Sequence, residues 1–220
     1  MPPRTLTMAF FGLVLGVTLG CAGASPAEAP PRAPEHAVPA PVQKDAADGF
    51  DGSFAERSLA RVPARVSLPD ARSWHAHASG SFTVLEHAST HSTLTLRVAA
   101  AARLVRPEQC EADARLARPS LPPSDGASVV ERRALAAPQG FDTRLVVGVE
   151  PRAGGTVHGY ALAIGAATGR CYVACFETEG GGPHAPDDVA DRLAVVVSGV
   201  FETLRIPSAD ERAVPPIGVK

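Results

Sequence analysis

The sequence predicts an α+β domain: an antiparallel sheet meander packed by a C-terminal amphipathic helix and by one shorter helix. Stretches in which apolar and polar residues alternate follow one another with short connections, which is typical of antiparallel strands. One run near the C-terminus instead repeats its apolar residues at helical spacing. The roughly 160 residues between two proline-rich ends suffice for one domain with a complete core.

The expected strands form two groups. Residues 81–85 and 93–98 should pair as a hairpin, with Leu94, Leu96 and Val98 sharing one face. Four further strands are expected at residues 129–135, 144–150, 157–164 and 170–178. Because the connections between neighbours are short, we expect these strands to pair antiparallel in a meander.

Two helices are expected. The first begins at Pro107-Glu108, because proline is favoured at the first helical position and a carboxylate suits the positive end of the helix dipole. It must end before Pro119. The second begins at Pro186 and ends at Pro207, and its apolar residues should pack on one face of the sheet. These apolar residues are Val189, Leu193, Val196, Val200 and Leu204.

The N-terminus has the pattern of an export signal. Arg4 precedes an apolar run, residues 6–19, that is shorter than the about 20 residues of a spanning helix. The run ends in Gly20-Cys21 and resembles the signal peptide of bacterial lipoproteins, which implies removal of residues 1–20 and lipidation of Cys21. Leucine stands two positions before the cysteine here, not three as is usual in that family. Ordinary cleavage at Ala22-Gly23-Ala24 and an uncleaved anchor therefore remain alternatives.

The same resemblance implies a place in the cell envelope. Ala22 after the cysteine resembles lipoproteins sent on to the outer membrane, with the domain facing the periplasm or the cell surface. Residues 21–47 are rich in alanine and proline and predict an extended tether. Residues 48–206 should form the single globular domain and residues 207–220 a loose tail. The expected partners are the membrane, through the lipid, and an unidentified envelope protein.

The charge balance gives no electrostatic case for a nucleic-acid partner. The chain has a formal net charge of −2 and a pI near 6.4, whereas nucleic-acid-binding domains are usually strongly basic. Aromatic residues make up only 5% of the chain, which argues against an aromatic platform for single strands or carbohydrate. We therefore expect no nucleic acid among the partners.

Three cysteines remain for the domain. Cys171 and Cys175 are four residues apart in an expected strand, so their α-carbons lie about 13 Å apart. A disulfide needs less than about 7 Å. An exported compartment permits disulfides, so Cys110 on the first helix should pair with Cys171 or Cys175, which share a face. The remaining thiol should be buried and inert.

Four of the seven histidines lie close together in the sequence: His75, His77, His87 and His91. His75 and His77 share one side of an extended segment, and the other two bracket a hairpin tip. Imidazoles at this density can bind zinc or copper, with Glu86 as an oxygen donor. The simpler interpretation is that they are polar residues on the wet face of a strand and in a turn. We expect no cofactor, with zinc or copper as the alternative.

Catalytic patterns are scarce, so we expect no enzyme. No Gly-x-Ser-x-Gly elbow occurs. The run Gly180-Gly181-Gly182-Pro183 has no Lys-Ser/Thr after it and is not a phosphate loop. Glu86 and His87 lie near Ser89 and Ser92, but consecutive residues at a hairpin tip point in opposing directions.

The order of elements, with the Trp-bearing segment 70–74 before the first hairpin, weakly resembles the PsbP-like group of α/β sandwich domains. Many of these domains are lumenal or lipid-anchored, and no functional residue transfers from them. We expect a non-catalytic protein-interaction or envelope-assembly module, which predicts an exposed apolar patch or an open sheet edge. The alternatives are metal binding and a small-ligand carrier, which would show a pocket lined by Val and Leu between sheet and helix.

Overall fold

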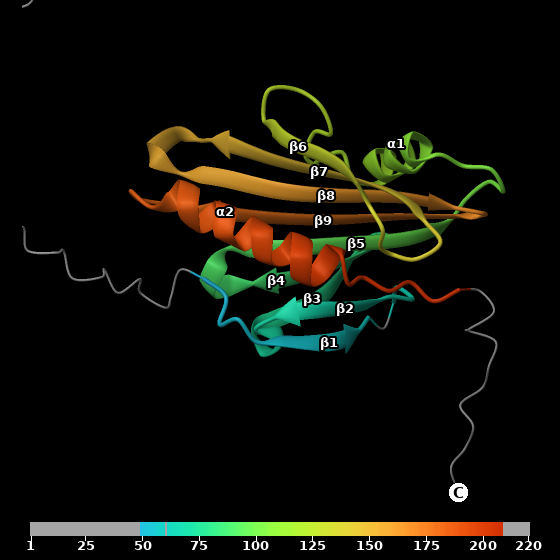
Figure 1. Ribbon diagram of the computed structural model, residues 1–220, viewed down its shortest axis with the longest axis horizontal. Coiled ribbons are helices and arrows are strands. Elements are labelled where there is room, and N and C mark those ends of the chain that lie inside the picture. The colour runs from blue at the N-terminus through green and yellow to red at the C-terminus, as the bar shows by residue number, and fades with distance from the viewer. Residues whose placement is uncertain (1–48, 60, 209–220) are drawn as a thin grey trace, which may run out of the picture. The chain divides into compact units, whose positions relative to one another are not determined.

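The computed structural model describes residues 49–59 and 61–208. A seven-stranded sheet dominates it (Figure 1). Its strands are β3 (Trp74–Ser79), β4 (Phe82–His87), β5 (Ser92–Ala100), β6 (Val129–Leu135), β7 (Asp142–Pro151), β8 (Val157–Ala167) and β9 (Arg170–Gly180). A separate two-stranded sheet pairs β1 (Phe54–Ser58) with β2 (Arg65–Pro69). With two helices, α1 (Pro107–Ala117) and α2 (Ala185–Val196), the α+β class expected from the sequence is confirmed.

The strand order in the large sheet is β3-β4-β5-β9-β8-β7-β6, and every pairing is antiparallel. The expected meander is present as two runs, β4-β5 and β6-β7-β8-β9, and β3, which was expected only as an extended segment, pairs with β4 at the end of the first run. The two runs join where β5 pairs with β9, from Ser92 opposite Thr178 to Ala100 opposite Arg170. The α1 helix lies in the connection between β5 and β6, so the chain crosses one face of the sheet before the second run begins.

One face of the sheet packs against α2, and we refer to it as the α2 face (Figure 1). The helix continues into a π-helical segment, Val197–Phe201. All five apolar residues of the expected stripe are buried on this side, with Leu94, Leu96 and Phe176 of the sheet among their neighbours in the core. Apolar burial of this kind is the main force that holds a helix on a sheet.

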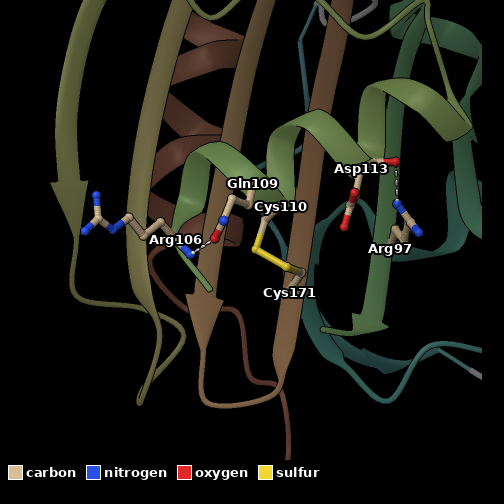
Figure 2. The surroundings of a disulfide bond; sticks show 6 residues. All are labelled: Arg97, Arg106, Gln109, Cys110, Asp113 and Cys171. Atoms are coloured by element: carbon tan, nitrogen blue, oxygen red, sulfur yellow. Dashed lines mark hydrogen bonds between the residues drawn. A yellow bond between two sulfur atoms is a disulfide. The ribbon is translucent and has the colours of Figure 1, made fainter. Parts of the chain in front are cut away.

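The opposite face carries α1 and is called the α1 face. Its smaller core contains Cys110 and Ala114 of the helix together with Leu162 and Ile164 of β8. The helix begins with Pro107, and Gln109 Oε1 accepts a hydrogen bond from the backbone N–H of Arg106 at 3.0 Å (Figure 2). Because α1 is only 11 residues long, it covers only part of this face.

Within the described ranges, no helix is both long and apolar enough to cross a membrane. The expected signal peptide, Cys21 and the tether at residues 21–47 lie outside these ranges, as does the tail from residue 209 onward. Lipidation and the proposed boundaries of the domain therefore stay predictions.

Candidate functional site

The two edge strands of the large sheet differ in how they are protected against pairing with another chain. On β6, Glu131, Arg132 and Arg133 are exposed, and the register with β7 shifts between Val129 and Glu131. Exposed charges and bulges of this kind are the usual means by which edge strands are kept from pairing. The β6 edge is therefore blocked.

The β3 edge lacks these protections. Its sequence, Trp-His-Ala-His-Ala-Ser, contains no Lys, Arg, Asp, Glu or Pro, and its register with β4 is unbroken over six residues. All of its residues except Trp74 are exposed. An edge strand that is regular, uncharged and exposed can accept a further strand.

The hairpin geometry identifies which backbone groups of β3 face outward. The turn between β3 and β4 has two residues, and Ser79 lies opposite Phe82 beside it. The pair that flanks such a turn exchanges both backbone hydrogen bonds, and bonded and non-bonded pairs alternate from there. By this alternation, Trp74, Ala76 and Ala78 direct their N–H and C=O groups away from β4. Arg57 of β1 donates to the Trp74 carbonyl at 2.8 Å, which leaves the two alanines to offer their groups to a partner.

Trp74 anchors the first residue of β3. Its side chain is 3% exposed, and its Nε1–H donates to the Pro69 carbonyl oxygen at 2.7 Å. The ring contacts Phe50 and His87, with centroids 6.1 Å and 5.1 Å away. Burying an aromatic side chain of this size contributes roughly 1.5–3 kcal/mol or more. One end of β3 is therefore held rigidly against the core.

His87 lies opposite Trp74 on β4 and is 1% exposed. Its Nε2 lies 3.0 Å from Asp70 Oδ2, and its Nδ1 lies 2.8 Å from Thr90 Oγ1. Hydrogen bonds from Ser73 and then His87 lower the pKa of the Asp70 carboxyl below its ordinary value. The imidazole thus ties the turn before β3 to the turn after β4.

The hydrogen bonds continue from Thr90 into the sheet. Thr90 Oγ1 donates to Ser92 Oγ at 2.8 Å, and Ser92 Oγ donates to Thr178 Oγ1 at 2.9 Å. Arg192 of α2 donates to the carbonyl oxygens of Thr90 and Glu179, at 3.1 and 2.8 Å. Hydrogen-bonded networks that are buried in this way fix a single arrangement of the elements they join.

An Asp–His–hydroxyl chain also occurs in hydrolases, but the chain here ends on a buried hydroxyl group. The hydroxyl closest to His87 belongs to Thr90, which is 0% exposed and cannot reach a substrate. Ser89 is exposed, yet its Oγ lies farther away, 3.3 Å from the same Nδ1. Glu86 and His87 point to opposite faces as expected, whereas a 3₁₀ turn at Ala88–Thr90 brings the Ser89 hydroxyl back to the His87 ring.

The structure does not bring the four clustered histidines together. His75 and His77 lie on the α1 face, where His77 Nε2 is 3.9 Å from Glu86 Oε1. His87 lies on the α2 face, because successive residues of a strand point to opposite sides. His91 adopts a left-handed conformation with φ +48° at the end of its turn. In the part of the chain that is described, no group of three or more His, Cys, Asp or Glu is placed to hold a metal ion, so the four-histidine zinc or copper site is not assembled.

A fifth histidine, His158, has a carboxylate on each side of its ring, although the sequence indicated no partner for it. His158 of β8 is buried, with Nδ1 3.6 Å from Glu150 Oε2 of β7 and Nε2 3.5 Å from Glu177 Oε1 of β9. These three residues come from three strands, so no local sequence pattern reveals them. They form a Glu–His–Glu ladder across the α1 face.

Beside this ladder the α1 face is slightly hollowed, with a volume of about 220 Å³. The lining is polar: His91, Thr93, Arg118, Arg152, His158, Glu177, Thr178 and Glu179. A second hollow of about 380 Å³ at the start of α1 is lined mainly by polar and charged residues. Neither hollow has the Val and Leu lining that we expected of a small-ligand carrier.

Of the two partners left open for Cys110, the structure has Cys171. The bond joins α1 to β9 on the α1 face, with α-carbons 5.4 Å apart (Figure 2). Nearby, Arg97 of β5 donates to the Asp113 carbonyl oxygen at 3.1 Å (Figure 2). Cys175 is a free thiol that is fully buried, and burial raises its pKa well above the ordinary value. A thiol in this state is a poor nucleophile.

No protein-family model matches this chain, and no curated protein matches it. Similar solved structures include a protein from Bacteroides thetaiotaomicron, with 10% identity over 74% of this chain and a TM-score of 0.42. The chain spans only 50% of that protein's length. A cyanobacterial PsbP from Synechocystis sp. PCC 6803 has 11% identity and a TM-score of 0.40. The match covers 68% of this chain and 92% of the PsbP chain. LpqN of Mycobacterium tuberculosis has 14% identity and a TM-score of 0.36, and it is described as involved in cell envelope biogenesis. The match covers 73% of this chain and 87% of the LpqN chain. A PsbP protein is thus among the similar structures, and no functional residue is transferred from any of the three.

Proposed function

We propose that this protein is a lipid-anchored, non-catalytic module of the cell envelope that binds an extended segment of another protein along β3. The observation that carries the proposal is the contrast between the two sheet edges. The β6 edge has three exposed charges and a bulge, whereas β3 has none of these and is exposed from His75 to Ser79. The anchor at Cys21 and the tether are the sequence-based part of the proposal.

Strand addition at this edge would have modest affinity. The outward N–H and C=O groups of Ala76 and Ala78 allow four backbone hydrogen bonds, each with a net contribution of about 1 kcal/mol. A dissociation constant of 1 μM needs about 8 kcal/mol, so side-chain contacts must supply the rest. Anchoring raises the effective concentration of partners on the same membrane. Residues 21–47, at about 3.1 Å per residue, would give the domain a reach of up to about 8 nm.

Photo-crosslinking of the full chain in cells tests the proposal. Variants carry p-benzoylphenylalanine in place of Ala76 or Ala78, and the control carries it in place of Val130, which is 66% exposed on β6. We expect one discrete product from the β3 positions and none from the control, with the crosslink mapped by mass spectrometry to one segment of one partner. Products that are the same at all three positions, or no product, would contradict the proposal. A product of twice the chain mass would replace it with self-pairing.

A proline at the outward position gives an independent check. Ala76→Pro removes one outward N–H and leaves the pairing with β4 intact, because proline is tolerated on edge strands. The crosslink from position 78 should disappear while the thermal unfolding midpoint of the domain stays within a few degrees of the parent. Crosslinking that persists with the proline in place would show that the partner does not pair with the backbone of β3.

A further inference from the structure

The α1 face of the sheet contains one complete Glu–His–Glu ladder. Glu150 lies directly opposite His158 in the register of β7 and β8, and Glu177 approaches the ring from β9 on the other side. The two carboxylates are 3.6 and 3.5 Å from the two ring nitrogens. A histidine on this surface is therefore flanked by a carboxylate on each neighbouring strand.

The open edge presents part of the same arrangement. Glu86 of β4 lies directly opposite His75 and is 3.9 Å from His77 Nε2. These three residues lie on the same α1 face as the complete ladder. Glu86 is four residues after Phe82 of the α1-face core, so the two side chains point to the same side of β4, and His75 and His77 lie on that side in the neighbouring strand. β3 is the edge of the described sheet, so no further strand of this sheet places a carboxylate on the outer side of the two histidines.

We propose that the segment that docks on β3 carries acidic side chains over His75 and His77, alternating with apolar side chains over Ala76 and Ala78. The inference rests on the proposed function, and it specifies the class of partner. A docked strand would lie about 4.8 Å from β3 and about 9.6 Å from Glu86. The imidazoles would then be its nearest polar neighbours on this face. Each imidazole has an N–H to donate to a carboxylate in either protonation state.

The side chains on the α2 face of β3 indicate which residues of the docked segment should be apolar. Ala76 and Ala78 are exposed there and lie opposite Leu85 and Thr83 of β4. Their small side chains leave room for larger apolar residues from the docked strand, which would cover the alanine methyl groups. Because side chains alternate along a strand, the preferred segment alternates acidic and apolar residues.

Peptide binding to the full chain, purified in detergent micelles, tests the inference. The probe is a fluorescein-labelled seven-residue peptide in which Val alternates with Glu, and the matched control peptide has Lys in place of each Glu. Each exposed ion pair changes affinity by up to about five-fold. Fluorescence anisotropy should therefore show the Glu peptide binding several-fold more tightly than the Lys peptide, by up to about five-fold for each of the two histidines.

Variants assign this preference to β3. The double variant His75→Gln/His77→Gln should lose the discrimination, whereas His184→Gln, at an exposed histidine before α2, should keep it. Equal binding of both peptides, blocked by Ala76→Pro, would overturn the acidic preference and leave strand docking in place. If neither peptide binds at about 1 mM, the inference is wrong, and the cellular crosslinks then decide separately whether any strand docks. Dimerisation of the chain without peptide would assign the edge to a second copy.

Discussion

Replacing Asp70 by asparagine tests whether the polar contacts around His87 hold the start of β3. Asp70 has a φ of +47°, a left-handed conformation that asparagine also tolerates, so the backbone should not change. The substitution removes the charge that faces His87 Nε2 at 3.0 Å. A hydrogen bond to a charged group contributes about 1.5–3 kcal/mol, and because 25% of the Asp70 side chain is exposed we expect the lower end, about 1.5 kcal/mol.

The loss of stability should depend on pH with a definite sign. Hydrogen bonds from Ser73 and from His87 lower the pKa of Asp70 below its ordinary value of 3.8. The Asp70 carboxyl group therefore binds a proton more readily in the unfolded chain than in the folded chain. Its contribution to the free energy of unfolding is complete above the unfolded-state pKa. It is lost as the pH falls through the lowered pKa. The difference between parent and Asp70→Asn should therefore be largest near neutral pH and should shrink on acidification.

Urea unfolding of the full chain at several pH values, followed by Trp74 fluorescence, measures this difference directly. Asp125→Asn, at an exposed carboxyl group, is the control and should have little effect at any pH. Hydrogen exchange should also become faster at the first residues of β3 in Asp70→Asn. A stability difference that stays constant with pH, or grows in acid, would refute the assigned role of Asp70.

Three further outcomes follow from the packing. Cys110→Ala/Cys171→Ala opens a loop with a sequence separation of 61 residues and should lower the free energy of unfolding by about 4 kcal/mol; guanidinium unfolding that shows under about 1 kcal/mol would contradict this. Cys175 should react with a thiol reagent only after denaturation, because it is fully buried with a raised pKa. Gly165→Ala should lower the thermal midpoint by several degrees, since its Cβ would overlap the Tyr172 ring; an unchanged midpoint would refute this.

Local patterns were sufficient for the elements whose neighbours lie close in the sequence. Alternation along residues 93–98 identified the strand and its apolar face, because that face contacts the core over its whole length. The stripe from Val189 to Leu204 identified the C-terminal helix for the same reason. By contrast, β1, β2 and β3 were not predicted as strands. β1 and β3 are almost wholly exposed and have no apolar face, and the alternation of Val66 and Leu68 in β2 covers only five residues.

Long-range arrangement could not be predicted from the sequence. Nothing in β5 or β9 alone indicates that they pair with each other, because short connections indicate only which consecutive strands are neighbours. The same limit hid the ladder of Glu150, His158 and Glu177, which depends on the register of three strands. The four clustered histidines were misleading for the opposite reason. Nearness in sequence suggested a common site, but strand alternation and a turn sent them to different faces.

An open edge strand can bind a specific partner, but it can also cause aggregation. The composition of β3 bears on both outcomes. A regular exposed edge made of large apolar residues would pair with any available strand and aggregate. On β3 the exposed side chains are Ala, Ser and His, which add little apolar area, so the backbone alone cannot hold an arbitrary partner. Strand pairing should then be stable only when the side chains of the partner also fit. Adding a charge to the edge by Ala76→Lys should accordingly abolish docking, with little change in the stability of the domain.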